Sequence, residues 1–188
     1  LRRERGDDYA GILYAGAISS DGRYLAVGGR DLSIHAGGEA SVRIIDLEED
    51  LIVAVLQSHA STITKIAFSP NDEFLASGSA DGQVRLWRTG PLAEPRLIEK
   101  SKVLEGHAGQ ITTLAFTEDG SRLLSSSASP RQNLILWDTS ALGGNVDDAT
   151  IEGIQCAPTP LEKHENLVYA ADITPGGEWI VSGDEDGN

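Results

Sequence analysis

The stretch HASTITKIAFSPNDEFLASGSADGQVRLWR, from His59 to Arg88, decides the fold because variants of it return along the chain. The variant HAGQITTLAFTEDGSRLLSSSASPRQNLILWD runs from His107 to Asp138, and HENLVYAADITPGGEWIVSGDEDGN begins at His164. A more divergent copy, from Leu13 to Asp46, precedes them. Equivalent apolar positions are 50, 48 and 57 residues apart, at Ile18, Phe68, Phe116 and Ile173. Such a period predicts an array of repeated structural units.

Each copy predicts several short β-strands and no segment of helix length. In Ile63–Phe68 and Val84–Trp87, β-branched and aromatic side chains alternate with polar ones, the period of a strand with two different faces. Dipeptides such as Asp81-Gly82 favour tight hairpins, whose turns need positive φ. The runs Leu51–Leu56 and Lys102–Leu104 supply a fourth strand. The sequence therefore predicts an all-β fold, a β-propeller of four-stranded antiparallel blades.

At these positions the chain resembles the WD-repeat β-propeller family. The resemblance rests on Gly106-His107 before a first strand, Phe68-Ser69-Pro70 after one, Leu75-Ala76-Ser77-Gly78-Ser79 in a second strand, and the third-strand endings Val84-Arg85-Leu86-Trp87 and Leu136-Trp137-Asp138. It covers the chain from about Leu13 to Asn188.

The resemblance implies a buried hydrogen-bond network of His, Ser, Asp and Trp inside each blade. The same residue types also form the acyl-transfer triad of hydrolases, but here we interpret them as structural. The residues assigned to the network are His59, Ser77, Asp81 and Trp87 in the second copy, His107, Ser126 and Trp137 in the third, and His164, Ser182 and Asp186 in the fourth. Because a longer loop replaces the Asp-Gly turn of the third copy, we expect its network to be incomplete.

The repeats divide the chain into one partial propeller of about 3.5 blades. The expected limits are about 12–56, 59–104, 107–162 and, incomplete, 164–188. Members of the resembled family most often have seven blades, so we expect the remaining blades to come from the same polypeptide or, as the less favoured alternative, from other copies. The absence of methionine supports the interpretation that the sequence is a fragment.

Composition excludes several classes of function. The formal net charge of −14 argues against nucleic acid as a partner. No run is apolar and long enough for a membrane helix. The lone Cys156 cannot form an internal disulfide, which favours a reducing, cytoplasmic location, or a nuclear one in a eukaryote. Acidic residues surround Cys156 in the sequence, so we expect its thiol to be unreactive. No phosphate-binding glycine loop or metal-ligand spacing occurs, so we expect no cofactor, no metal and no catalytic residue in this segment.

The predicted function is a protein-interaction scaffold that binds a protein or peptide. Residues 139–188 contain ten Asp or Glu and one Lys, a net −9, which favours a basic partner. The candidate partner-binding residues are Ser61, Thr62, Ala80, Gln110, Asn166, Asp184 and Glu185. The alternative is an accessory or regulatory propeller of a larger enzyme, because the first copy, from Leu13 to Gly29, is similar to the opening blade of bacterial propellers attached to caspase-like peptidases.

Overall fold

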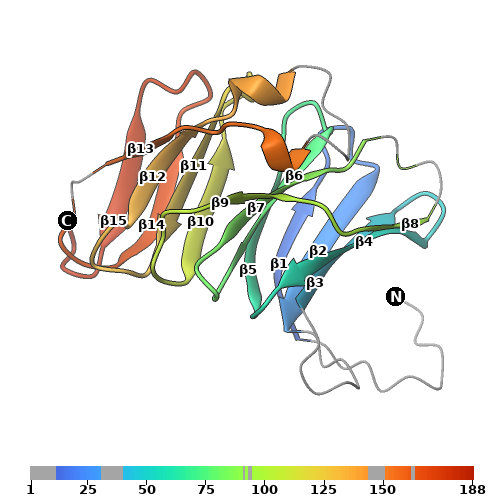
Figure 1. Cartoon of the computed structure of the whole chain (residues 1–188), viewed down its shortest axis with the longest axis horizontal. Helices are drawn as coiled ribbons and strands as arrows, with labels where there is room; N and C mark the ends of the chain where they lie inside the picture. Colours follow the sequence, from blue (N-terminus) through green and yellow to red (C-terminus); the bar gives the residue numbers. More distant parts are fainter. Residues whose placement is uncertain (1–11, 31–39, 91, 93–94, 144–150, 162–163) are drawn as a thin grey trace.

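The computed structural model describes residues 12–30, 40–90, 92, 95–143, 151–161 and 164–188. Short strands make up most of this part of the chain, with two 3-10 helices between β12 and β13 (Figure 1). The elements are β1 (Ile12–Ile18), β2 (Tyr24–Arg30), β3 (Ala40–Asp46), β4 (Leu51–His59), β5 (Ile63–Phe68), β6 (Phe74–Ser79), β7 (Val84–Arg88), β8 (Arg96–Ile98), β9 (Lys102–Leu104), β10 (Ile111–Phe116), β11 (Arg122–Ser127), β12 (Leu134–Asp138), η1 (Ser140–Gly143), η2 (Ile151–Gly153), β13 (Pro158–Pro160), β14 (Val168–Ile173) and β15 (Ile180–Asp184).

The strands form four sheets that stand side by side in chain order, as blades 1 to 4 (Figure 1). Blade 1 contains β1, β2, β3, β4 and β8; blade 2 contains β5, β6, β7 and β9; blade 3 contains β10 to β13; and blade 4 contains β14 and β15. The first strands of consecutive blades, β1, β5, β10 and β14, contact one another. The predicted all-β fold of antiparallel propeller blades is confirmed.

Blade 1 differs from the expected four strands because β8 pairs with the outer edge of β4 in parallel. The sequence placed this segment within the second unit, 59–104. The packing of β8 explains why it pairs with blade 1: its Ile98 is buried, with Leu92, in the core that blades 1 and 2 share. Pairing also satisfies backbone groups that the edge of β4 would otherwise expose.

A hydroxyl closes the first turn of every blade in the same way. The oxygen of the first turn residue accepts the N–H of the residue five positions later, at distances of 2.8 to 3.1 Å. The pairs are Ser19 with Tyr24, Ser69 with Phe74, Thr117 with Arg122, and Thr174 with Trp179. A repeated Ser or Thr therefore fixes the same turn geometry in four places.

Glycines allow neighbouring blades to approach closely. A Cβ added to Gly78 in β6 would lie 2.4 Å from Cγ2 of Ile111 in the next blade. A Cβ on Gly28 of β2 would lie 2.9 Å from Ile63 Cγ2. Both isoleucines are fully buried, so the absent side chains leave space that apolar groups of the following blade fill.

The blades present loops at two ends. The end that carries His59, His107 and His164 is named here the histidine face. The other end, which carries the β5–β6 and β10–β11 turns and η1, is named the groove face. Loops on such a packed scaffold are held in place, which suits them to recognition.

Candidate functional site

Blade 2 brings together the four network residues that the sequence assigned to it. His59 Nε2 lies 2.7 Å from Ser77 Oγ, and Trp87 Nε1 donates to the same oxygen at 2.8 Å. His59 Nδ1 lies 3.1 Å from Asp81 Oδ2. Burial alone would raise the pKa of Asp81, but hydrogen bonds from His59 and the Gln83 N–H outweigh it and lower that pKa.

The Asp81–His59–Ser77 order matches the triad of acyl-transfer enzymes, yet its setting does not allow attack on a substrate. Ser77 and Trp87 are both 0% exposed, and the indole N–H occupies the hydroxyl oxygen that would have to reach a carbonyl. The arrangement instead satisfies three buried polar side chains and the partly buried Asp81 carboxylate with one another.

Blade 3 corrects one expectation. His107 Nε2 lies 2.6 Å from Ser125 Oγ, and Trp137 Nε1 donates to Ser125 Oγ at 2.8 Å, so Ser125 and not Ser126 holds the network. Ser126 Oγ pairs with Thr112 Oγ1 at 2.8 Å instead. Successive side chains of a strand point to opposite faces, so a shift of one residue exchanges the two roles.

A constant interval in the sequence identifies the correct serine. The network serine follows its histidine by 18 residues in blades 2, 3 and 4. Counting this interval from His107 gives Ser125. Three consecutive serines, from Ser125 to Ser127, occupy this part of the strand, so the presence of a serine there does not by itself identify the one in the network.

The main chain supplies the third partner in blade 3. His107 Nδ1 donates to the carbonyl oxygen of Gln132 at 2.6 Å, in the place that Asp81 takes in blade 2. Burial lowers the pKa of His107 to about 4, against a smaller upward effect of the Gln132 carbonyl. The network expected to be incomplete therefore has three side chains and one backbone group around a neutral imidazole.

Blade 4 corrects a second expectation. His164 lies 2.7 Å from Ser182 Oγ through Nε2 and 2.7 Å from Asp184 Oδ2 through Nδ1, so Asp184 replaces Asp186 in the network. Asp186 accepts a hydrogen bond from the side-chain amide of Asn166. Asp184 occupies the position of Ser79 in blade 2, and its longer side chain reaches the imidazole. The hydrogen bond from His164 lowers the pKa of Asp184 to about 2.

The residues proposed to contact a partner lie on loops of the histidine face. Ala80, Gln110 and Glu185 are exposed there. Ser61, Thr62 and Asn166 are half-buried. Their backbone carbonyls accept hydrogen bonds from the end of β6, the β6–β7 loop and the β11–β12 loop, respectively. Asp184 is the exception, because His164 engages its carboxylate.

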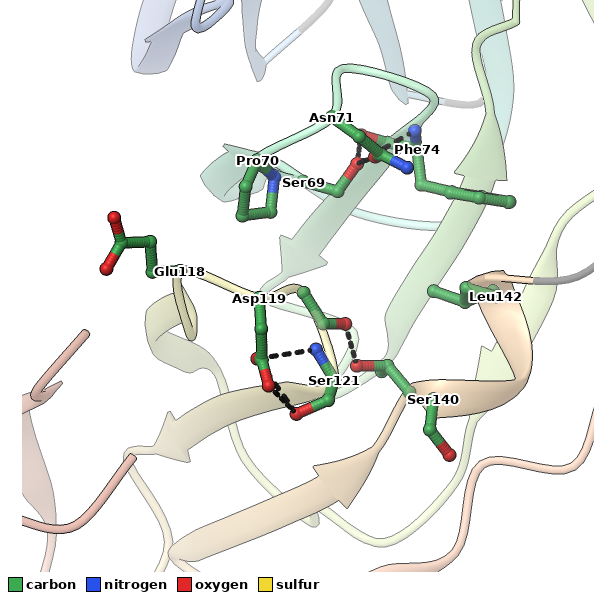
Figure 2. Close-up of a pocket in the computed structure, with 11 residues that line it drawn as sticks. Ser69, Pro70, Asn71, Phe74, Glu118, Asp119, Ser121, Ser140 and Leu142 are labelled. Carbon is green, nitrogen blue, oxygen red and sulfur yellow. Dashed lines mark hydrogen bonds between the residues drawn. The ribbon is translucent and has the colours of Figure 1, made fainter. Parts of the chain in front are cut away.

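A groove of about 390 Å³ opens on the groove face between blades 2 and 3 (Figure 2). Its walls are the β5–β6 turn (69–74), the β10–β11 turn (118–121) and the residues around η1 (139–142). Phe74 and Leu142, which are 2% and 4% exposed, contribute apolar surface. Sequence reasoning missed this groove because residues from two repeats and an insertion form it together.

Hydrogen bonds hold the walls of the groove. Thr139 donates from its N–H to Ser121 O and from its hydroxyl to Gly120 O, at 2.8 and 2.7 Å. Asp119 Oδ1 accepts from Thr117 Oγ1 at 2.6 Å and from the Ser121 N–H at 2.9 Å. Chiefly through the Thr117 hydroxyl, these bonds lower the pKa of Asp119 to about 2, so its carboxylate is ionised at neutral pH.

Cys156 is half-buried, and burial raises the pKa of its thiol to about 11. Among the described residues, no group of three or more His, Cys, Asp or Glu side chains is arranged to hold a metal ion. No helix in the same part of the chain has the length and apolar composition needed to span a bilayer.

Comparison with known proteins finds one family along most of the array. The family described as WD domain, G-beta repeat (WD40) matches residues 51–88, 98–138 and 155–188. The first match runs from β4 of blade 1 to β7 of blade 2, the second from the end of β8 through β9 of blade 2 to β12 of blade 3, and the third from beside β13 of blade 3 through blade 4. Each sequence repeat therefore contains strands of more than one blade.

Similar proteins include actin-interacting protein 1-2 of Arabidopsis thaliana, 32% identical over 87% of this chain and 25% of that protein. Human striatin-4 is 37% identical over 42% of this chain and 11% of its own length. The chain thus spans a quarter or less of these relatives. A solved structure, the computationally designed Ika4 protein, matches with a TM-score of 0.67 and 23% identity, covering 100% of this chain and 96% of that one, and supports the fold.

Proposed function

The chain belongs to the WD40 (WD domain, G-beta repeat) family, and on that premise we propose that this protein-interaction module binds a basic segment of a partner protein. The observation that carries the proposal is the acidic character of its ordered loops. On the groove face every blade contributes carboxylates, accompanied by Arg23, Arg88 and Arg122. The acidic residues are Asp21, Glu48, Glu49, Asp50, Asp72, Glu73, Glu118, Asp119, Asp138 and Glu178.

The histidine face offers fewer free carboxylates than the sequence indicated. Of the charges counted in residues 139–188, Asp147, Asp148, Glu162 and Lys163 lie outside the described residues. Glu165 and Glu185 are exposed at blade 4, whereas Asp184 belongs to the internal network. A test that reverses the charge of Asp184 would therefore disturb the blade as well as the surface.

The proposal is tested by measuring the binding of a labelled basic peptide, (Arg-Leu)4, to the full chain by fluorescence anisotropy, with (Glu-Leu)4 as the control peptide. We expect saturable binding of the basic peptide that weakens as salt is raised, because salt screens attraction between exposed charges. Absence of saturable binding at low salt, or equal binding of the acidic peptide, contradicts the proposal.

We also propose that further blades of a longer polypeptide cover the two open ends of the array. Trp179 and Val181 of blade 4 are both 74% exposed, and Tyr14, Ile18 and Leu97 of blade 1 are exposed as well. Apolar surface of this extent is typical of an interface. Sedimentation analysis tests the alternative source, because a defined particle of two copies would show that a second chain supplies the missing blades.

A further inference from the structure

The groove of Figure 2 lies between blades 2 and 3, whose four strands are all present, so it does not depend on what covers the ends of the array. Its volume of about 390 Å³ falls at the lower end of the range of ligand-binding pockets, roughly 300 to 1,000 Å³. This space suits one long side chain and part of the backbone that carries it.

Resting on the proposed function, we propose that this groove is the docking site and that it takes an arginine or lysine side chain from an extended segment of the partner. The aliphatic part of that side chain lies against Pro70, which is half-buried, and against the small exposed parts of Phe74 and Leu142. Its charged end lies at Asp119 and Glu118, which line the same groove.

The charge and the apolar surface together select this occupant. A basic side chain combines several methylene groups with a charged end, and such side chains commonly bury the first while keeping the second among polar groups. Phe74 and Leu142 offer the apolar contact, and two acidic residues stand at the adjoining turn. An acidic or wholly apolar segment would satisfy one of these features and not the other.

Asp119 retains hydrogen-bonding capacity for a ligand. A carboxylate oxygen has two lone pairs, and among the described residues Oδ2 of Asp119 accepts from Ser121 Oγ, at 2.8 Å. Bonds from the Thr117 hydroxyl and from the Ser121 N–H fix the orientation of the group through Oδ1, and Figure 2 shows those from Ser121. A charge that is already oriented gains a hydrogen bond from a guanidinium or ammonium group at little cost in side-chain entropy.

The walls of the groove are also ordered before a ligand arrives. The Glu118 N–H donates to Pro175 O of blade 4 at 2.9 Å, which anchors the β10–β11 turn on one side. Thr139 anchors the same turn on the other side, through the Ser121 and Gly120 carbonyls. The groove is thus built by contacts from three blades or their connections, and its shape does not require a partner.

The test measures (Arg-Leu)4 affinity for the full chain carrying Glu118→Gln, Asp119→Asn or both. Asn keeps an acceptor oxygen for the turn and removes the charge. We expect each substitution to weaken binding about tenfold and the pair to do so more strongly. The matched controls are Glu185→Gln on the histidine face and Glu49→Gln on the groove face at blade 1, which we expect to change affinity less than about twofold.

A second variant tests the shape of the groove without changing its charge. Ser140 lines the groove and is exposed, so Ser140→Trp is expected to fill it and to weaken binding at least tenfold, whereas Gln110→Trp on the histidine face is expected to have no effect. Circular dichroism and urea unfolding of each variant verify that the fold is retained.

The outcomes separate the groove from the proposed function. If the peptide binds and Glu185→Gln weakens it while the groove variants do not, the groove assignment is wrong and the proposed function stands. Equal, small losses in all charge variants indicate diffuse attraction and also overturn the groove. If the unaltered chain does not bind the peptide, the proposed function itself fails.

Discussion

Blades 2 and 3 hold the same three side chains in nearly the same geometry but end the network on different acceptors. In both, the serine oxygen lies 2.6 to 2.8 Å from the histidine Nε2 and the tryptophan Nε1. The imidazole and indole rings cross at 62° and 69°, with centroids 6.5 Å apart in each blade. The third partner is the Asp81 carboxylate in blade 2 and the Gln132 carbonyl in blade 3.

The difference shows that the His–Ser–Trp arrangement does not need a carboxylate. A carboxylate places a negative charge beside the imidazole, whereas a backbone carbonyl is neutral. The two blades should therefore respond alike to the loss of their serine and differently to acid.

The largest effect is expected from removing the serine that holds the blade 3 network. Ser125→Ala leaves the Trp137 N–H and the His107 ring without their buried partner, which we expect to lower the free energy of unfolding by about 3 kcal/mol. Ser126→Ala removes a single pairing with Thr112 and is expected to cost about 1 kcal/mol. Urea unfolding of both variants checks the assignment, and the reverse order of losses would contradict it.

Acid is expected to open blade 3 before blade 2. The pKa of His107 is about 4 in the folded protein and near 6.5 in the unfolded chain, so the neutral ring stabilises the fold fully above pH 6.5, and this stability is lost as the pH falls toward 4. At pH 4.5 the expected loss is about 2 kcal/mol. The pKa of Asp81 is lowered, so its contribution is lost only below pH 3.8.

Hydrogen exchange of the two indole N–H groups measures this difference directly. Between pH 7 and 4.5, Trp137 should lose protection relative to Trp87, after correction for the intrinsic exchange rate. Equal changes at both indoles would show that the group bonded to the histidine Nδ1, a carboxylate in blade 2 and a carbonyl in blade 3, does not affect the response to acid.

Replacing the carboxylate of blade 2 is expected to have a smaller effect. Asp81→Asn leaves one acceptor oxygen where two now accept, because the Gln83 N–H donates to Oδ1 and the Ala60 N–H and His59 Nδ1 to Oδ2. The substitution also removes the charge beside His59, at an expected cost of about 1.5 kcal/mol. Glu49→Gln serves as the control, because Glu49 is exposed on the β3–β4 turn and its replacement removes a surface charge. A cost no larger than that of the control, measured in urea, would mean that the charge of Asp81 contributes nothing.

The smallest effect concerns the backbone that positions the blade 3 acceptor. Gln132 has a φ of 50°, a conformation that side chains with a Cβ adopt at some cost. Gln132→Gly keeps the carbonyl and relieves that cost, so we expect a gain of about 0.5 kcal/mol in the free energy of unfolding. A thermal unfolding midpoint below that of the unaltered chain would contradict this expectation.

The sequence predicted the blades well and the partners within them less well. Period-2 alternation and repeated turns indicated strands such as β5 and β7, because both features arise from local backbone preferences. Ser126 and Asp186 were assigned to networks that the structure builds from Ser125 and Asp184. Ser126 is next to Ser125 within β11, and Asp186 lies two residues beyond Asp184, the last residue of β15. The strand pattern by itself does not show which of these side chains faces the histidine.

The sequence by itself determined the repeat, the first three strands of blades 2 and 3, the histidine, serine and tryptophan types of the network, and the acidic character of the protein. Tertiary structure alone decided that β8 joins blade 1, that the Gln132 carbonyl replaces a carboxylate, and that a groove forms between blades 2 and 3. The physical reason is the range of the interactions. Strand alternation and turn chemistry depend on neighbouring residues, whereas an edge pairing, a buried acceptor and a groove depend on which distant segments come into contact.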